Sequence, residues 1–202
     1  MTIDTVVPVA PSVPDLQNDS GSSNTDNITN DATPIFTGSA ETGSVVRIFD
    51  GAGNVGTGSA PGGSYSVQTS ALSNGPRAIS ATATDIAGNA SASSAVLTVT
   101  IDTIAPVVAV TSPTNSASFD FGEEISISGT RSDTNRPVQV TVWRTSVGGT
   151  VAFSESIAPG ASMWASSGNL YSFGTYFARA TQTDVAGNIG TSNTNQFTVT
   201  AV

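Results

Sequence analysis

An internal repeat constrains the fold of this chain more than any other feature of its sequence. The phrase Thr84-Asp85-Ile86-Ala87-Gly88-Asn89 returns as Thr183-Asp184-Val185-Ala186-Gly187-Asn188, and Thr2-Ile3-Asp4-Thr5 returns as Thr100-Ile101-Asp102-Thr103. The two copies of each phrase lie about one hundred residues apart, which is the size of a small domain. The sequence therefore predicts two domains of similar length, each with its own core.

The second Ile-Asp-Thr phrase marks the predicted boundary between the domains. We expect domain 1 at residues 1–103 and domain 2 at residues 104–202. Residues 2–5 are similar to the end of a preceding unit, so we also expect the chain to be a segment of a longer array. Its first residues lack the basic and apolar regions of a secretion signal peptide.

Short segments of alternating character, separated by Gly, Ser, Thr, Asn and Pro, predict an all-β fold. Strands of this kind, each with one covered and one wet face, are typical of the Ig-like antiparallel β-sandwich, which has about seven of them. We therefore expect two tandem Ig-like sandwiches arranged end to end. The expected strands are 33–40, 44–50, 64–69, 77–84 and 95–101 in the first half, and 107–111, 124–129, 138–143, 151–156, 163–165, 175–183 and 196–200 in the second.

The second half contains most of the aromatic residues. Trp164 takes the place of Tyr65 in a strand, so we expect it in the core. Trp143 lies opposite the face that Val138, Val140 and Val142 share, which leaves two interpretations open. It either covers the sheet, or it belongs to a ligand-binding surface with Arg144 or Tyr171. Aligning the halves by phase pairs Phe49 with Trp143, Tyr65 with Trp164 and Leu97 with Phe197.

The composition argues against an enzyme. Histidine, cysteine and lysine are absent, so the chain has no imidazole base, thiol or Schiff-base amine, and it lacks the usual zinc ligands. No Gly-x-Ser-x-Gly motif is present. Glu123 and Glu124 are adjacent on a predicted strand and point to opposite faces, so they cannot flank one glycosidic bond. We expect a non-enzymatic protein.

The charge of the chain limits its partners. The net charge is −9 although only 10% of the residues are charged. Nucleic acids and anionic membranes attract basic surfaces, so we expect neither as a partner, and cations are the natural ones. No apolar run approaches the ~18 residues of a membrane span, so we expect no membrane insertion. We expect a monomer.

Several phrases of the sequence are similar to a known family. Residues 19–31 with Thr33-Pro34, and the later phrases 85–89 and 101–106, resemble the bacterial Ig-like repeats of giant surface adhesins. In the second half, residues 115–120 replace the Asp-Ser-Gly opening of this pattern. The resemblance implies export from Gram-negative bacteria by type I secretion, as in RTX-type adhesins. It also implies an extender segment at the cell surface, with neighbouring Ig-like repeats of the same polypeptide as partners.

The resemblance also implies Ca²⁺ at domain junctions. In an Ig-like sandwich the exit loop of the first strand lies at the C-terminal end, and the last hairpin lies at the N-terminal end. The acidic loop of domain 1 should therefore approach the linker, and the last hairpin of domain 2 should face it. Carboxylate, amide and carbonyl oxygens are the ligands that Ca²⁺ prefers. The candidates are Asp19, Asp26, Asn27, Asp31, Asp102, Asp184 and Asn188, with Asp4 and Asp85 at the preceding junction.

Two alternatives stay open. Asp and Asn also cap turns through nearby backbone amides, so the same residues are explained by turn chemistry without a metal. A ligand-binding domain 2, using Trp143, Arg144 or Tyr171 to bind a glycan or a protein of a host or surface, competes with the extender function. A structural module of a phage or surface layer would also suit this fold.

Overall fold

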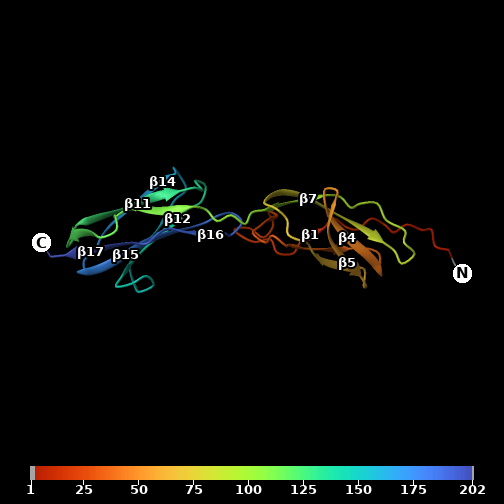
Figure 1. Cartoon of the computed structure of the whole chain (residues 1–202), viewed down its shortest axis with the longest axis horizontal. Helices are drawn as coiled ribbons and strands as arrows, with labels where there is room; N and C mark the ends of the chain where they lie inside the picture. The colour runs from red at the N-terminus through yellow and green to blue at the C-terminus, as the bar shows by residue number, and fades with distance from the viewer. Residues whose placement is uncertain (1–2, 202) are drawn as a thin grey trace. The chain divides into compact units, whose positions relative to one another are not determined.

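The computed structural model describes residues 3–201, which form strands, turns and loops and contain no helix (Figure 1). The chain divides into two compact units, with the division between Thr103 and Ile104. We call the N-terminal part unit 1 and the C-terminal part unit 2. Each unit consists of a smaller and a larger β-sheet, which confirms the predicted all-β sandwich fold.

Unit 1 pairs a three-stranded sheet with a five-stranded sheet. The orders are β1-β3-β6 and β2-β8-β7-β4-β5, and neighbours are antiparallel except for β2 and β8, which run parallel. The strands are β1 Asp15–Leu16, β2 Ile28–Thr29, β3 Ile35–Ser39, β4 Ser44–Asp50, β5 Gly53–Ala60, β6 Ser64–Gln68, β7 Gly75–Thr84 and β8 Leu97–Ile101.

Unit 2 repeats this plan, and five of its strands, β9, β10, β11, β14 and β17, are longer than their counterparts in unit 1. Its sheets have the orders β14-β11-β9 and β10-β17-β15-β12-β13, with β16 paired to β15, and β10 runs parallel to β17. The strands are β9 Val108–Ser112, β10 Ala117–Asp120, β11 Glu124–Arg131, β12 Val138–Arg144, β13 Thr150–Ile157, β14 Met163–Asn169, β15 Gly174–Thr183, β16 Ile189–Thr191 and β17 Asn195–Thr200.

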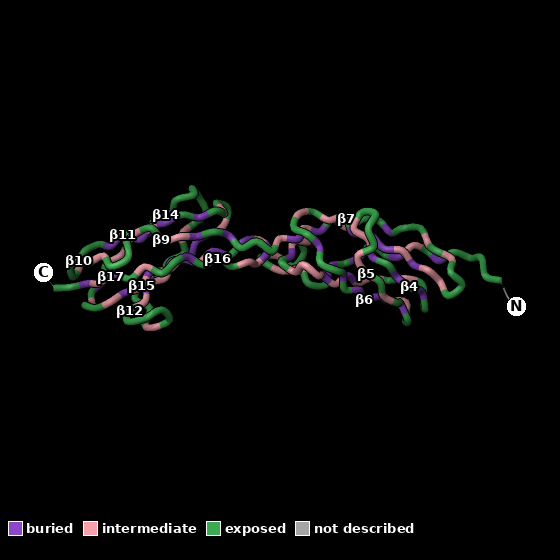
Figure 2. Tube along the Cα trace, in the orientation of Figure 1, coloured by how far each residue is buried: buried purple, intermediate pink, exposed green. Residues whose placement is uncertain are grey.

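Buried residues alternate with exposed ones along the strands (Figure 2). In β4 the side chains of Val46 and Ile48 are fully buried, while Val45 and Arg47 between them are exposed. Both sheets of each unit contribute to its core, because apolar side chains on the inner faces leave water together. Unit 1 buries Phe36, Val67, Ile79, Val99 and Ile101 among others, and unit 2 buries Ile125, Ile127, Val140, Tyr176 and Phe197.

Each core has an aromatic ring lying over a glycine of the neighbouring strand. Tyr65 of β6 pairs with Gly38, and Trp164 of β14 pairs with Gly129; each ring is only 3% exposed. A side chain on either glycine would collide with the facing ring. The indole Nε1 of Trp164 donates to the Thr130 carbonyl at 3.0 Å. The structure confirms the predicted core position of Trp164.

The alignment of the two halves is wrong by two residues in β4 and β17. Ala81 and Ala180 occupy equivalent positions, because each donates its backbone amide to a serine hydroxyl. The acceptor is Ser94 in unit 1 and Ser192 in unit 2. Ala81 lies opposite Ile48, and Ala180 lies opposite Val140. Phe49 therefore corresponds to Thr141, not Trp143, and by the same registers Val99 rather than Leu97 corresponds to Phe197.

The sequence-based strand assignment missed β5, which is rich in glycine. Gly56 and Gly58 lie so close to β6 that a Cβ on either would stand 2.9 or 2.7 Å from the Val67 side chain. Glycine weakens strand propensity, yet here it permits the close approach of two strands. In unit 2 the corresponding contact is polar, since the Ser166 hydroxyl donates to the Glu155 carboxylate.

Candidate functional site

The repeated phrase of unit 1 forms a hairpin turn closed by a carboxylate and an amide. The Asp85 amide donates to the Asn89 carbonyl at 3.1 Å, and Gly88 adopts a φ of 95°. Asp85 Oδ1 accepts from the Asn89 backbone amide and Oδ2 from its side-chain amide, both at 2.8 Å. The side-chain hydrogen bond from Asn89, aided by backbone amides, lowers the pKa of Asp85 below its ordinary value.

The same hairpin recurs in unit 2. Asp184 Oδ1 accepts from the Asn188 backbone amide and Oδ2 from the Asn188 side chain, both at 2.9 Å, and Gly187 also has a φ of 95°. Asp184 is 6% exposed. These contacts are the turn chemistry that the sequence left open for the repeated phrase. They do not use every lone pair of the carboxylates.

Asp4 lies beside the Asp85–Asn89 hairpin of unit 1. The Asn89 side-chain amide donates to the Asp4 carbonyl at 3.2 Å, although the two residues are far apart in sequence. Asp4 Oδ1 accepts from the Val6 amide at 3.0 Å. The structure therefore brings Asp4 and Asp85 to one end of unit 1, as the topological argument expects.

The acidic loop of unit 1, residues 19–31, contains a buried oxygen that lacks a partner. Asp19 Oδ2 accepts from the Asn27 amide at 2.9 Å, whereas Asp19 Oδ1 is buried without a hydrogen-bond partner among the described residues. Asn27 has a φ of 57°, which places it in the left-handed region. Asp26 and Asp31 each accept the amide two residues ahead, from Ile28 at 3.1 Å and Thr33 at 2.8 Å.

Asp102 lies next to this acidic loop. β2 pairs with β8 in parallel, so Thr29 lies opposite Ile101. The Thr100 amide donates to the Asn27 carbonyl at 2.8 Å, and the Asp102 amide donates to the Thr29 carbonyl at 2.9 Å. The structure thus places Asp102 at the end of unit 1 that holds the loop, which is the placement expected from the sequence.

A pocket of about 250 Å³ lies in unit 2, where β12 and β13 meet the loop between β14 and β15. Arg144 and Tyr171, which the sequence singled out, both line it. The Arg144 guanidinium donates through Nη2 to the Phe173 carbonyl at 2.6 Å. It lies against Gly174, where a Cβ would stand 3.4 Å from Nε. The remaining lining residues are Thr150, Ala152, Asn169, Leu170, Ser172 and Tyr176.

Three exposed aromatic rings gather beside this pocket. Phe121, Tyr171 and Phe173 are 45%, 70% and 52% exposed. The ring of Phe121 lies 4.9 Å from that of Phe173 and 6.3 Å from that of Tyr171, measured between centroids. We call these three residues the aromatic cluster. The sequence pattern does not predict that Phe121 and Phe173 are neighbours of Tyr171, because turn geometry rather than periodicity brings them together.

Trp143 lies away from this pocket, on the outer face of the larger sheet. It pairs with Phe177 of β15, and the Arg179 guanidinium stacks over its ring at 5.2 Å. Adjacent residues of a strand point to opposite faces, so Trp143 and Arg144 are separated by β12 itself. The stacked arginine is consistent with the covering interpretation of Trp143.

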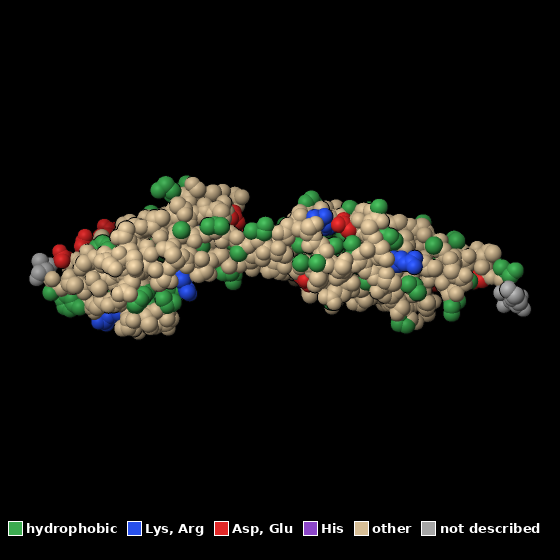
Figure 3. Space-filling model, viewed as in Figure 1, with side chains coloured by type: hydrophobic (Ala, Val, Ile, Leu, Met, Phe, Trp, Pro, Cys, Tyr) green, Lys and Arg blue, Asp and Glu red, His purple; other side chains and the backbone are tan. Residues whose placement is uncertain are grey.

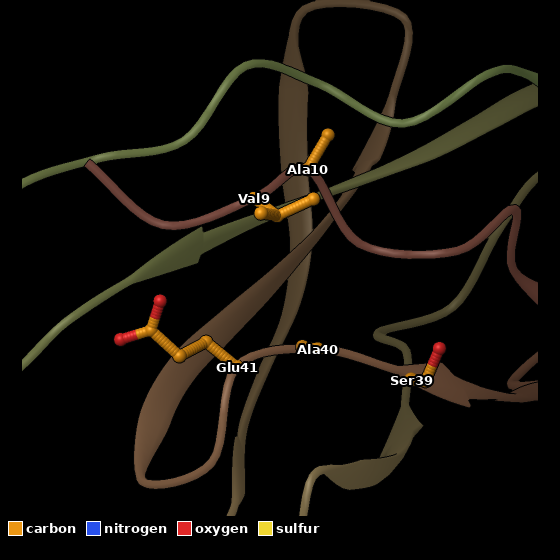
Figure 4. Close-up of a pocket in the computed structure, with 5 residues that line it drawn as sticks. All are labelled: Val9, Ala10, Ser39, Ala40 and Glu41. Atoms are coloured by element: carbon orange, nitrogen blue, oxygen red, sulfur yellow. The ribbon is translucent and has the colours of Figure 1, made fainter.

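A second pocket, of about 310 Å³, lies in unit 1 (Figure 4). Val9, Ala10, Ser39, Ala40 and Glu41 line it, and Glu41 is its one titratable residue. A single carboxylate with neither a base nor a nucleophile beside it offers no acid–base pair. In the view of Figure 3 arginine side chains are scattered over the surface, whereas several acidic side chains lie near the C-terminal end.

The fit of Ca²⁺ depends on oxygens rather than on a dense carboxylate cluster. Among residues 3–201 no group of three or more His, Cys, Asp or Glu side chains stands close enough to hold a metal. The acidic loop nevertheless offers the unpartnered Asp19 Oδ1, the Asp26 and Asp31 carboxylates and nearby backbone carbonyls. Ca²⁺ takes six to eight oxygens of such mixed origin, so these donors suit the ion.

Within the described part of the chain, no helix is long and apolar enough to cross a membrane. Residues 7–103 match the family model of the bacterial Ig-like domain, which is nearly all of unit 1. The sequence matches none of the curated proteins.

Several solved structures are similar to this chain at low identity. The fibronectin(III)-like modules of CbhA from Clostridium thermocellum are 18% identical with a TM-score of 0.45, covering 99% of this chain and 93% of that chain. A tetra-tandem repeat in the extending region of a large adhesion protein is 23% identical with a TM-score of 0.41, and the match covers 96% of this chain and 50% of that one. The BSP domain of a biofilm-associated protein is 20% identical with a TM-score of 0.31, at 95% and 30% coverage.

Proposed function

We propose that this chain is a non-enzymatic extender segment of a bacterial surface adhesin, exported by type I secretion, and that Ca²⁺ stiffens it. The observation that carries the extender function is the duplicated sandwich. Both units have the same Asp–Asn hairpin and the same aromatic ring over a glycine. In both, a strand amide donates to a serine hydroxyl at the same position. Repeating one domain framework lengthens the chain, which is what a spacer requires. The match of residues 7–103 to bacterial Ig-like domains supports this function.

Calcium binding is proposed first for the acidic loop and Asp102 of unit 1. A buried carboxylate oxygen without a hydrogen bond is costly, and a bound cation would compensate it. Asp19 Oδ1 is such an oxygen, and the parallel pairing of β2 with β8 keeps Asp102 beside the loop. Extracellular modules bind Ca²⁺ with Kd values of about 10⁻⁴ to 10⁻³ M, so the ion would be bound outside the cell and released in the cytosol.

Thermal unfolding tests this site. At 10 mM Ca²⁺, mass action with such a Kd stabilises unit 1 by about 1 to 3 kcal/mol, and an equal concentration of Mg²⁺ stabilises it less because Mg²⁺ demands a stricter geometry. Asp19→Asn should abolish the calcium-dependent rise in Tm. Asp15→Asn, which changes an exposed carboxylate of β1, is the matched control and should keep it. A Tm that ignores Ca²⁺ would refute the site.

The sequence also predicts that Asp184 and Asn188 contribute to the same ion, and that Asp4 and Asp85 belong to an equivalent site with a preceding repeat. These contributions stay predictions. Small-angle scattering with Ca²⁺ and with a chelator measures the distribution of distances between the two domains. A distribution that narrows with Ca²⁺ in the native chain, and not in Asp102→Asn, is the expected result. An unchanged distribution would leave the extender without calcium stiffening.

A further inference from the structure

We propose that the pocket lined by Arg144 and Tyr171 in unit 2 binds an acidic sugar, such as a uronic acid residue of a polysaccharide. In this site the Tyr171 ring is the platform on which the sugar stacks, and the Arg144 guanidinium is the partner of its carboxylate. The proposal goes beyond the extender function and does not depend on Ca²⁺.

The aromatic cluster provides a fixed and accessible ring. Tyr171 is 70% exposed, so its ring adds little to the core. Phe121 nevertheless holds it edge-on, and Phe121 in turn packs on Phe173. A neighbouring group of exposed rings is unusual for a surface that has no partner, because it leaves apolar area in water. An open aromatic face suits the C–H groups on one side of a sugar ring.

Arg144 provides an uncompensated positive charge. Among residues 3–201 no carboxylate forms an ion pair with Arg144. One N–H of its guanidinium is bound to the Phe173 carbonyl, and the group lies beside the backbone of Gly174. The bond fixes the guanidinium and leaves its other donors for a carboxylate, which it can bind in a bidentate manner.

The other lining residues suit a hydroxylated ligand. Thr150, Ser172 and Asn169 bring hydroxyl and amide groups to the pocket, and none of the residues that line it is acidic. Asn169 donates to the Gly122 carbonyl at 2.9 Å, which leaves its side-chain oxygen to accept from a sugar hydroxyl. The volume of about 250 Å³ suits a single sugar ring rather than a folded partner.

The surrounding charge favours a sugar with no more than one carboxylate per ring. Asp120, Glu123 and Glu124 lie in and beside the turn that carries Phe121, and the whole chain has a net charge of −9. Densely charged polymers such as sulfated polysaccharides are repelled by this field. A uronate ring brings a single carboxylate, which pairs with Arg144, so it meets less of that repulsion.

The test is a titration of the ¹⁵N-labelled 202-residue chain with D-glucuronate, D-glucose and trigalacturonate, followed by amide chemical shifts in the presence of a chelator. We expect shifts near residues 144–150 and 169–174, with uronates preferred over glucose. Arg144→Gln should weaken uronate binding at least about 10-fold and erase the preference. Tyr171→Ala should weaken both sugars, and Tyr171→Phe should restore binding because it keeps the ring.

The matched control is Arg47→Gln, which removes the same charge from an exposed site of unit 1 and should leave every affinity unchanged. Tyr171 is so exposed that its substitution leaves folding intact, and the amide spectrum verifies this. The proposal is overturned if trigalacturonate shifts no amide of the pocket, or if Arg47→Gln weakens binding as much as Arg144→Gln. Tighter binding of the acidic peptide Gly-Gly-Glu than of trigalacturonate would overturn it in favour of a peptide site.

Discussion

The two units differ most at one end of the sandwich, where unit 1 is polar and unit 2 is aromatic. In unit 1 the last residue of β4, Asp50, pairs with Arg77 at 3.5 Å, and the two side chains are 23% and 24% exposed. The strand registers place Val142 and Tyr176 of unit 2 at these two positions, and both are buried. Tyr176 stacks on Phe197 at 5.6 Å between centroids.

One hydrogen bond is kept through this exchange. In unit 1 Arg77 Nε donates to the Ser73 carbonyl at 2.8 Å, and in unit 2 the Tyr176 hydroxyl donates to the Ser172 carbonyl at 2.7 Å. Beyond it, β12 continues past the place where β4 ends and adds Trp143 and Arg144. An extended β12–β13 hairpin and an aromatic end therefore provide the pocket of unit 2. In unit 1 β4 ends at Asp50, so the ion pair between Asp50 and Arg77 forms this end instead.

The largest expected effect comes from truncating the aromatic end. Tyr176→Ala removes a buried ring and should destabilise unit 2 by about 3 to 5 kcal/mol. Arg77→Ala at the corresponding position of unit 1 removes a partly exposed ion pair and should cost about 1 kcal/mol or less. Urea unfolding of both variants measures the difference. Equal losses would show that the two ends are energetically alike and would break the comparison.

The next effect concerns the glycines under the two rings. In Gly129→Ala the new methyl group collides with the Ala109 carbonyl and the Trp164 ring, so we expect a loss of about 2 to 3 kcal/mol in unit 2. In Gly38→Ala the nearest atoms are the ends of the Tyr65 and Ser12 side chains, at 2.5 and 2.7 Å, which can move. The loss in unit 1 should be smaller. Thermal unfolding checks the order, and a larger loss in Gly38→Ala would contradict it.

The smallest effect concerns pH and the hairpin of unit 1. Because hydrogen bonds from Asn89 lower the pKa of Asp85 below 3.8, the folded state binds this proton less readily than the unfolded state. The resulting stability is present above pH 3.8 and is lost as the pH falls through the lowered pKa. Urea unfolding between pH 2 and 5 should therefore show a steeper acid loss in the native chain than in Asp85→Asn. Identical slopes would remove Asp85 from the acid response.

Alternation and repetition made most of the fold predictable. The repeated phrases located the hairpins, and the alternation in 44–50 predicted β4 with its buried Val46 and Ile48. The residue-by-residue alignment of the two halves was harder to predict, because a shift of two residues keeps every side chain on the same face of its strand. Phe49 and Trp143 therefore agree in face although they differ in position.

The candidate site was predictable in part. Topology correctly brought the acidic loop to Asp102 and brought Asp4 to the first hairpin. An aspartate whose oxygens are bound by an asparagine looks the same in sequence as an aspartate with an open oxygen, so Asp184 and Asp19 were indistinguishable until their contacts were seen. The aromatic cluster forms because the turn with Phe121 lies beside the loop with Tyr171 and Phe173. The hydrophobic pattern of the sequence does not predict that these two segments are neighbours.

The parallel pairing of an early strand with the last one has a mechanical consequence. When tension pulls on the two ends of a unit, parallel neighbours slide along each other, so their hydrogen bonds share the load and break together rather than one by one. β2 offers two residue pairs to β8, whereas β10 offers four to β17. In single-molecule pulling, unit 2 should therefore yield at a higher force than unit 1. The weaker unit then acts as the first element to lengthen under load, while the pocket of unit 2 stays folded.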